Sequence, residues 1–177
     1  AAHGLSVTVI DPVPHAGQVA SSSAVRERLA AGDPQGAAAI LGRWWEVEGR
    51  VRPGDRRGRQ IGFPTANLVL GDLLMPHFGV YAVRVGVCEG GKVRWHGGVA
   101  NLGRRPTFGG EAVRLEAHLF DFDGDLYGRL VRVALVDFLR PEQKFTGIEA
   151  LRDQIGRDSE RARTVLRELP ADLYPSI

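Results

Sequence analysis

Cysteine is almost absent from this sequence, since Cys88 is the one thiol among 177 residues. A single thiol excludes an intrachain disulfide framework and is compatible with a reducing cytoplasm. Long apolar runs are also missing, because none approaches the roughly 20 residues that a transmembrane helix needs. The N-terminus has no basic segment followed by an apolar core. We therefore expect a soluble cytoplasmic protein with no membrane partner.

The sequence also lacks a strong excess of charge of either sign. Its 23 basic side chains barely outnumber its 21 acidic ones, and the resulting net charge of +2 is too small to argue for a nucleic-acid partner. The basic residues do cluster, because Arg50, Arg52, Arg56, Arg57 and Arg59 lie in one short stretch without aromatic side chains. Such a cluster favours a site for a few phosphates over a stacking platform for bases, so nucleic-acid binding remains the weaker alternative.

Period-two alternation of apolar residues dominates the chain from Trp44 onward. This pattern predicts strands that send every second side chain into a core. Turns rich in Gly, Asp and Pro separate the strands, and no alternating helices support a parallel sheet. The predicted fold class is therefore mainly β, as an antiparallel meander or Greek-key barrel. The alternating positions are Tyr81, Val83, Val85 and Val87, then Val93, Trp95 and Val99, then Leu115, Ala117 and Leu119, and finally Val131, Val133 and Leu135.

One of these turns, Asp123-Gly124-Asp125, has the acidic spacing of a calcium loop at its start. The ligand positions that should follow in such a loop are missing, so we expect a hairpin turn at these residues.

Both ends of the chain have helical patterns. At the C-terminus, an apolar stripe predicts one amphipathic helix that lies against the open side of the barrel. Within residues 1–42, a strand is expected first, then a short helix capped by Ser23 and closed by Gly32, and a second from Asp33-Pro34 to Gly42. These elements are too few to build a core, so we expect residues 1–42 to be the end of a preceding domain and residues 43–177 to form the main domain. The strand residues are Leu5, Val7 and Val9, and the stripe is Ile148, Leu151, Ile155, Ala162, Val165, Leu166 and Leu169.

The run from Gly58 to Asn67 contains two glycines, a proline, a hydroxyl and a carboxamide behind the arginine cluster. Glycines let a backbone approach phosphate closely, and Pro64 directs the chain just before Thr65. Thr65 and Asn67 supply oxygen atoms that suit a hard cation such as Mg²⁺. A surface turn with solvated arginines is the alternative explanation of this run.

A possible general base lies on the strand that contains Leu115, Ala117 and Leu119. Glu116 falls on its opposite face together with His118, so one face carries a carboxylate and an imidazole. Glu116 is a candidate base for a hydroxyl nucleophile, because phosphoryl transfer needs mainly positioning and charge neutralisation. Ordinary surface charge on a solvated edge is the alternative reading of Glu116.

Eight motifs follow one another along the chain in a fixed order. They are Gly49-Arg50-Val51, Gly54-Asp55-Arg56-Arg57-Gly58-Arg59, Pro64-Thr65-Ala66-Asn67, Gly79-Val80-Tyr81-Ala82, Asn101-Leu102-Gly103-Arg104-Arg105-Pro106-Thr107-Phe108, Glu116-Ala117-His118-Leu119-Phe120-Asp121-Phe122, Asp125-Leu126-Tyr127-Gly128 and Phe138-Leu139-Arg140-Pro141-Glu142-Gln143-Lys144-Phe145. With these motifs the chain resembles, from Leu41 to Leu166, the riboflavin kinase module of bacterial bifunctional riboflavin kinase/FAD synthetases. The resemblance implies a six-stranded antiparallel Greek-key barrel with a C-terminal helix, which transfers the γ-phosphate of ATP to the ribityl 5′-hydroxyl of riboflavin and yields FMN.

The resemblance also implies roles for single residues. Thr65 and Asn67 would hold Mg²⁺ and the nucleotide phosphates, and Glu116 would be the catalytic base. Flavin would contact Arg140 and Phe145. The residues expected to bind the nucleotide are Gly54, Arg56, Gly58, Arg59, Gly62, Pro64, Thr65, Asn67 and Tyr127. One departure from the family pattern is Pro53, where related sequences often have histidine.

The N-terminal part resembles the end of the adenylyltransferase module that precedes the kinase in the bifunctional proteins. Ser21-Ser22-Ser23-Ala24-Val25-Arg26 is similar to its Ser-Ser-Thr-x-x-Arg segment. The nucleotidyltransferase motif His-x-Gly-His is missing from the sequence, so we expect no FAD synthesis from these residues. An adenylyltransferase domain upstream in the same polypeptide is the expected partner. A flavin- or nucleotide-binding module without turnover remains the alternative to a kinase.

Overall fold

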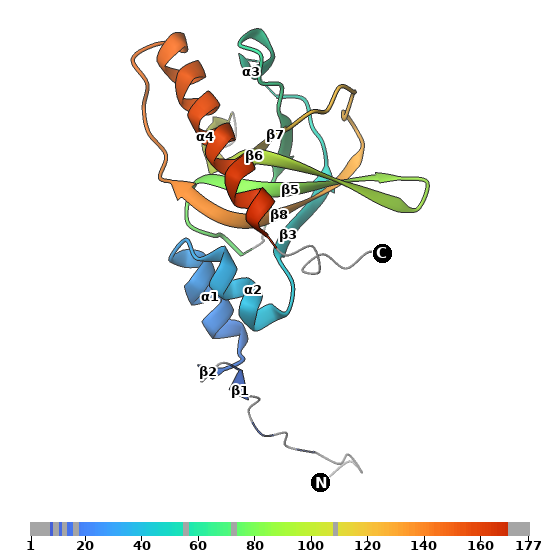
Figure 1. Ribbon diagram of the computed structural model, residues 1–177, viewed down its shortest axis with the longest axis vertical. Coiled ribbons are helices and arrows are strands. Elements are labelled where there is room, and N and C mark those ends of the chain that lie inside the picture. The colour runs from blue at the N-terminus through green and yellow to red at the C-terminus, as the bar shows by residue number, and fades with distance from the viewer. Residues whose placement is uncertain are drawn as a thin grey trace.

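Six antiparallel strands form one curled sheet (Figure 1). They are β3 (Trp45–Arg50), β4 (Ala66–Val69), β5 (Gly79–Glu89), β6 (Lys92–Thr107), β7 (Gly110–Leu119) and β8 (Leu130–Arg140). The computed structural model describes residues 8, 11, 14–15, 18–54, 57–71, 74–107 and 110–169, and within these residues the strand order is β3-β8-β5-β6-β7-β4. Because β8 returns to lie beside β5, strands β5 to β8 form a Greek key, as predicted.

The two edges of this sheet approach each other just past β3. Arg52 forms an isolated antiparallel bridge with Asn67 of β4 and donates its backbone N–H to the Asn67 carbonyl oxygen at 2.9 Å. The six strands therefore form a curled half-barrel, and the mainly β fold class expected from the sequence is confirmed.

The inside of the curled sheet holds the larger hydrophobic core. Strand register puts Leu115 opposite both Leu68 and Leu102, and it puts Ala117 opposite Ala66. These side chains are almost completely buried. The alternating residues of β5, β7 and β8 belong to this core, whereas Val99 of β6 faces the outer side of the sheet and packs in a second cluster.

Helix α4 (Ile148–Glu168) covers the outer face of the sheet (Figure 1). Its C-terminal half packs in the second cluster, where Ala162 and Leu166 are buried. The N-terminal half does not bury the stripe expected from the sequence, because Ile148 is 58% exposed and Leu151 and Ile155 are half-buried. The helix is therefore confirmed; it lies on the outer face of the sheet, and only the C-terminal part of its apolar stripe is buried.

Two short helices precede the sheet, as expected: α1 (Ser22–Ala30) and α2 (Pro34–Leu41). The cap of α1 is Ser21 rather than Ser23, because the Ser21 hydroxyl accepts the backbone N–H of Ala24 at 3.2 Å. Gly42 closes α2 with φ 69°, a left-handed conformation that glycine adopts readily. A small hairpin, β1 (Pro14–His15) with β2 (Gln18–Val19), comes before them. The strand expected at residues 5–9 lies outside the described residues, apart from residue 8.

Residues 120–129 link β7 to β8 without forming a hairpin. Strand β7 pairs with β4 and β6, whereas β8 pairs with β3 and β5, so the linker crosses from one part of the sheet to another. The hairpin turn expected at residues 123–125 is therefore wrong. In the described part of the chain, no helix is both long and apolar enough to cross a membrane.

Candidate active site

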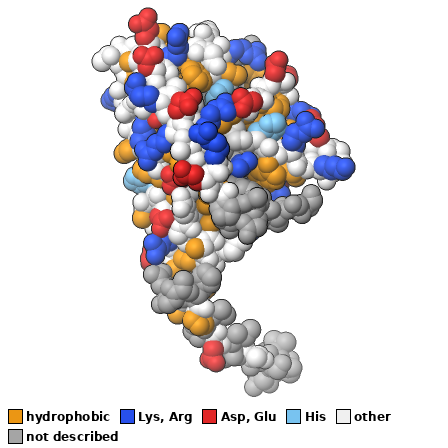
Figure 2. Space-filling view, in the orientation of Figure 1, with side chains coloured by type: hydrophobic (Ala, Val, Ile, Leu, Met, Phe, Trp, Pro, Cys, Tyr) orange, Lys and Arg blue, Asp and Glu red, His pale blue; other side chains and the backbone are white. Residues whose placement is uncertain are grey.

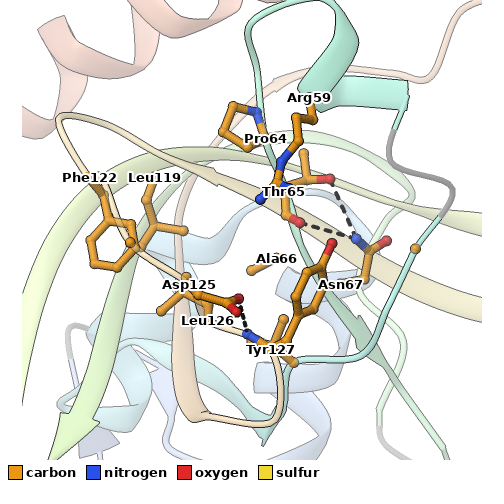
Figure 3. A pocket seen from close by; sticks show the side chains of 13 residues that line it. Arg59, Pro64, Thr65, Ala66, Asn67, Leu119, Phe122, Asp125, Leu126 and Tyr127 are labelled. Atoms are coloured by element: carbon orange, nitrogen blue, oxygen red, sulfur yellow. Dashed lines mark hydrogen bonds between the residues drawn. The ribbon is translucent and has the colours of Figure 1, made fainter.

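A cavity of about 70 Å³ lies beside β4 (Figure 3). One wall is the loop that leads into β4, and the other is the linker between β7 and β8. The cavity thus joins segments that are some sixty residues apart in sequence. The lining residues are Val51, Gly54, Arg59, Pro64, Thr65, Ala66, Asn67, Leu119, Phe122, Gly124, Asp125, Leu126 and Tyr127.

The first wall is a tight loop that begins with the short helix α3 (Arg57–Gln60). The backbone N–H of Phe63 donates to the Gly58 carbonyl oxygen at 2.8 Å. Gly58 leaves room for this turn, because a Cβ at Gly58 would lie 2.2 Å from the Phe63 carbonyl oxygen. From α3, Arg59 extends toward Thr65 (Figure 3) and brings positive charge to the cavity.

His118 holds this loop against β7. Its Nδ1 lies 2.9 Å from the Pro64 carbonyl oxygen, and its ring makes an edge contact with Phe63 at 5.2 Å between centroids. A carbonyl oxygen only accepts hydrogen bonds, so the imidazole donates from Nδ1. The residue just before Thr65 is therefore fixed to the strand that carries Glu116.

Asn67 is a buried polar residue in the cavity wall, with 8% of its surface exposed. Its Nδ2 group donates to the Thr65 carbonyl oxygen at 3.2 Å and to Thr65 Oγ1 at a longer 3.5 Å. None of the described residues donates a hydrogen bond to its Oδ1. Gly54 makes room for the amide, because a Cβ at Gly54 would lie 2.5–2.7 Å from its atoms.

This donor set fits a hard divalent cation. Amide, hydroxyl and carbonyl oxygens are ligands that Mg²⁺ accepts, together with water and phosphate oxygens. The Oδ1 atom of Asn67 and the oxygens of Thr65 meet this requirement in one small cavity. The cradle at Gly54 keeps the amide in place, since any larger residue there would occupy the same space.

The second wall comes from the linker that sequence analysis interpreted as a hairpin turn. Asp125 Oδ1 accepts the backbone N–H of Tyr127 at 2.9 Å, which folds the linker tightly beside the cavity (Figure 3). The N–H of Gly128 donates to the Val51 carbonyl oxygen at 2.9 Å and ties the linker to the chain after β3. Tyr127 thereby lines the cavity.

Glu116 lies beside the cavity rather than in its lining. It is half-buried and stands directly opposite Asn67 on β4 and Asn101 on β6. Directly opposite residues of an antiparallel pair share one face, with Cβ atoms about 4.5–5.5 Å apart. Asn67 therefore belongs both to the cavity and to the face that carries the Glu116 carboxylate.

The structure thus brings together most of the residues that the sequence singled out for the nucleotide. Gly54, Arg59, Pro64, Thr65, Asn67 and Tyr127 line the cavity, and Gly58 braces its loop. Gly62 is an exposed loop residue with φ 87° and is not part of the lining. Arg56 lies outside the described residues.

The two residues expected to contact flavin lie at the end of β8 and in the loop that follows it. Arg140 stands opposite Val80 of β5, which stands opposite Asn101 of β6, the neighbour of Glu116. Arg140 ends β8, and its Nη2 atom lies 2.7 Å from Oδ2 of Asp158 in α4. Its Nη1 group donates to the Pro141 carbonyl oxygen at 2.9 Å. The Phe145 ring centroid lies 5.8 Å from Arg140 Cζ. Arg140 therefore connects the sheet, the following loop and α4.

Sequence reasoning gave no role to several residues of this region, among them Phe122, Asp125 and Asn101. Phe122 and Asp125 belong to the cavity wall, and Asn101 stands next to Glu116. All three residues lie in motifs that carry the family resemblance, but the hairpin interpretation set Asp125 aside. The neighbour of Asn101 follows only from strand pairing.

The chain is similar to several known proteins. Residues 41–166 match the Flavokinase family model, described as riboflavin kinase. A curated relative from Haemophilus influenzae, named bifunctional riboflavin kinase/FMN adenylyltransferase, is 45% identical over 143 residues, which cover 81% of this chain and 46% of the relative. The chain spans about half the length of the curated relatives that it matches.

Two solved structures share the fold. The riboflavin kinase from Trypanosoma brucei matches with a TM-score of 0.51 and 25% identity, over 70% of this chain and 80% of that one. A structure from Streptococcus pneumoniae, named macrolide-efflux protein, matches with a TM-score of 0.77 and 35% identity, over 91% of this chain and 51% of that one. Because the family model covers most of the sequence, including both cavity walls and Glu116, the chain belongs to the riboflavin kinase family.

Proposed function

We propose that this chain transfers the γ-phosphate of MgATP to the ribityl 5′-hydroxyl of riboflavin and releases FMN. The observation that carries the proposal is the direct pairing of Asn67 with Glu116. It sets a phosphate- and cation-binding cavity beside a carboxylate that can accept a proton. Family membership supports the same reaction.

The residues of the cavity act on the nucleotide. Arg59 balances phosphate charge, and the glycine-containing loop lets the backbone approach the phosphates. Thr65 and Asn67 would hold Mg²⁺, which supplies charge neutralisation to the phosphates when bound. The His118 contact with Pro64 keeps Thr65 in register with β7.

Glu116 acts on the acceptor. Its carboxylate orients the 5′-hydroxyl of riboflavin and accepts the proton as the new O–P bond forms. The loop after β8 would bind the flavin ring, with Phe145 as the aromatic surface. The ion pair with Asp158 supports a structural contribution of Arg140, which would hold that loop in place.

The test is FMN formation by the 177-residue chain with riboflavin and MgATP, measured after chromatographic separation of the products. Loss of a general base costs about 10²- to 10⁴-fold in rate, so Glu116→Ala should lower kcat by that factor. Thr65→Ala should raise the KM for MgATP. Glu48→Ala, which removes an exposed strand glutamate that does not line the cavity, is the matched control.

Two outcomes would contradict the proposal. FMN formation that survives both site substitutions unchanged would refute the assigned residues. Quenching of riboflavin fluorescence by the wild-type chain without consumption of ATP would refute the kinase activity and favour a binding module.

We also infer that residues 1–42 are the end of an adenylyltransferase module and that the natural polypeptide continues upstream with it. The inference is supported by the names of the relatives and by the half of their length that this chain does not span. We also propose a cytoplasmic location, because a sequence with a single cysteine is compatible with a reducing compartment. The 177 residues lack the His-x-Gly-His motif, so they should form FMN but no FAD from MgATP and riboflavin.

A further inference from the structure

The loop between β8 and α4 turns back over the strand that neighbours Glu116. This loop, residues 141–147, runs from the end of β8 to the start of α4 (Figure 1). Its second residue, Glu142, accepts a hydrogen bond from Asn101 Nδ2 at 3.1 Å. Because Asn101 stands directly opposite Glu116, the Glu142 carboxylate lies on the same face of the sheet as the proposed base.

Gly103 provides the space for this carboxylate. A Cβ at Gly103 would lie 2.2 Å from Glu142 Oε1 and 2.6 Å from its Cδ, which is far inside van der Waals contact. Gly103 is not among the glycines with positive φ, so its backbone conformation is open to any residue. A Cβ here would displace the Glu142 carboxylate, which is the end of an exposed side chain, so the absence of a side chain at Gly103 leaves the room that Glu142 fills.

The bond between Asn101 and Glu142 also fixes an orientation. An ionised carboxylate only accepts hydrogen bonds, whereas a carboxamide has a donor end and an acceptor end. Glu142 therefore selects the donor end of the Asn101 amide and holds it toward the loop. The side chain next to Glu116 is thereby restricted to one arrangement.

The loop has a second attachment on its other side. Arg140 joins the loop to α4, through Asp158, and donates to the Pro141 carbonyl oxygen. One attachment holds the loop to the helix and the other holds it to β6. Phe145 lies in the same loop, three residues after Glu142, and the centroid of its ring lies 5.8 Å from Arg140 Cζ.

We propose that Glu142 is a positioning residue for the acceptor side of the reaction. By its bond to Asn101 and its seat on Gly103, it holds the 141–147 loop over the strand next to Glu116, so that a flavin on this loop presents its 5′-hydroxyl to the base. Glu142 does not exchange a proton with the substrate. The proposal rests on the riboflavin kinase activity proposed above.

The test compares four variants of the full 177-residue chain in initial-rate kinetics, with riboflavin and MgATP varied in turn. Glu142→Ala removes the contact, and Glu142→Gln keeps an oxygen that can still accept from Asn101. Gly103→Ala leaves both partners in place but takes up the space of the carboxylate. Glu48→Ala again controls for the loss of one exposed carboxylate. Riboflavin affinity is measured separately by fluorescence quenching.

Glu142→Ala and Gly103→Ala should each raise the KM and the dissociation constant for riboflavin about tenfold, the effect of losing one hydrogen bond to a charged group at a binding site. Both should leave the KM for MgATP within about twofold, because the cavity by Thr65 is unchanged. Glu142→Gln should restore most of the riboflavin affinity. Glu48→Ala should match the wild type.

The possible failures can be told apart. Wild-type riboflavin affinity and kinetics in Glu142→Ala would overturn the positioning role and leave the kinase activity standing. Equal losses for riboflavin and MgATP, or a Glu142→Gln variant as poor as Glu142→Ala, would do the same, because they indicate a general structural or charge effect. A wild-type chain that forms no FMN would overturn both proposals.

Discussion

Replacement of Gly54 by alanine tests the candidate cation site by steric displacement alone. Gly54 is not among the glycines with positive φ, so its backbone tolerates alanine. The new Cβ, however, would lie 2.5 Å from Nδ2 of Asn67 and 2.7 Å from its Oδ1. The substitution therefore changes no chemical group of the site and acts only by displacing the Asn67 amide.

The size of the effect follows from these distances. Ordinary contacts of a Cβ begin at 3.4 Å, so the amide has to retreat by about 0.7–0.9 Å. A buried side chain in a packed wall cannot move that far without cost, and overpacking of this kind destabilises by about 1–3 kcal/mol. The alternative is rotation of the amide out of the cavity, which breaks its hydrogen bonds to Thr65 at about 0.5–1.5 kcal/mol each. Either route moves Oδ1 from the position where it would bind Mg²⁺.

We expect Gly54→Ala to raise the KM for MgATP at least tenfold, since about 1.4 kcal/mol corresponds to that factor. The affinity for riboflavin should stay within about twofold. The assay is the initial rate of FMN formation at saturating riboflavin, with MgATP and free Mg²⁺ varied separately. Gly71→Ala is the control, because a Cβ at Gly71 meets nothing within 4 Å.

A second measurement isolates the contact. In an Asn67→Ala background the obstructing amide is gone, so Gly54→Ala should no longer lower the free energy of unfolding measured in urea. A wild-type KM for MgATP in Gly54→Ala would refute the reasoning, and so would an equal loss of stability with and without Asn67.

Three further predictions concern the supports of the site. His118→Ala should raise the KM for MgATP several-fold and speed up amide hydrogen exchange at residues 61–65, because the Pro64 carbonyl loses its partner; unchanged exchange would contradict the role of the imidazole. Asp158→Ala should lower the free energy of unfolding by about 3–5 kcal/mol in urea titrations, because it leaves the Arg140 charge without its partner; a loss below 1 kcal/mol would indicate a solvated pair. Burial raises the pKa of Asp137, because the protein interior disfavours the charged carboxylate. The protonated Asp137 therefore stabilises the fold fully below pH 3.8, its ordinary pKa, and this stabilisation is lost as the pH rises through the pKa of the folded state. Asp137→Asn should therefore raise the melting temperature at pH 7 and have little effect below pH 3.8, and the opposite pH dependence would refute the assignment.

Much of the site could be predicted because it is local in sequence. Thr65 and Asn67 are two residues apart at the start of a strand, so their backbone brings them to one side without help from other segments. The alternation around Leu115 and Ala117 likewise identified the buried face of β7 and left Glu116 on the other face. Hydrophobic periodicity is sufficient for such statements, because burial decides which face of a strand turns inward.

Hydrophobic periodicity could not show that residues 123–125 form no hairpin turn, nor that the start of α4 is exposed. A turn between two strands looks the same in sequence whether those strands pair or not. In this fold β8 pairs with β5, so the segment crosses over and becomes a cavity wall. The stripe of α4 is continuous in sequence, but only its C-terminal half meets the outer cluster on the sheet.

Residue patterns were enough to predict the fold class, the short motif proposed to hold a cation, and the carboxylate proposed as a base. That these parts lie next to one another follows from the tertiary structure. The pairing of β4 with β7 sets Asn67 against Glu116, and β6 adds Asn101 and, through it, Glu142. The physical reason is that alternation specifies the face of a residue, whereas its neighbour across the sheet depends on which strands pair, and that choice is made by the packing of the whole chain.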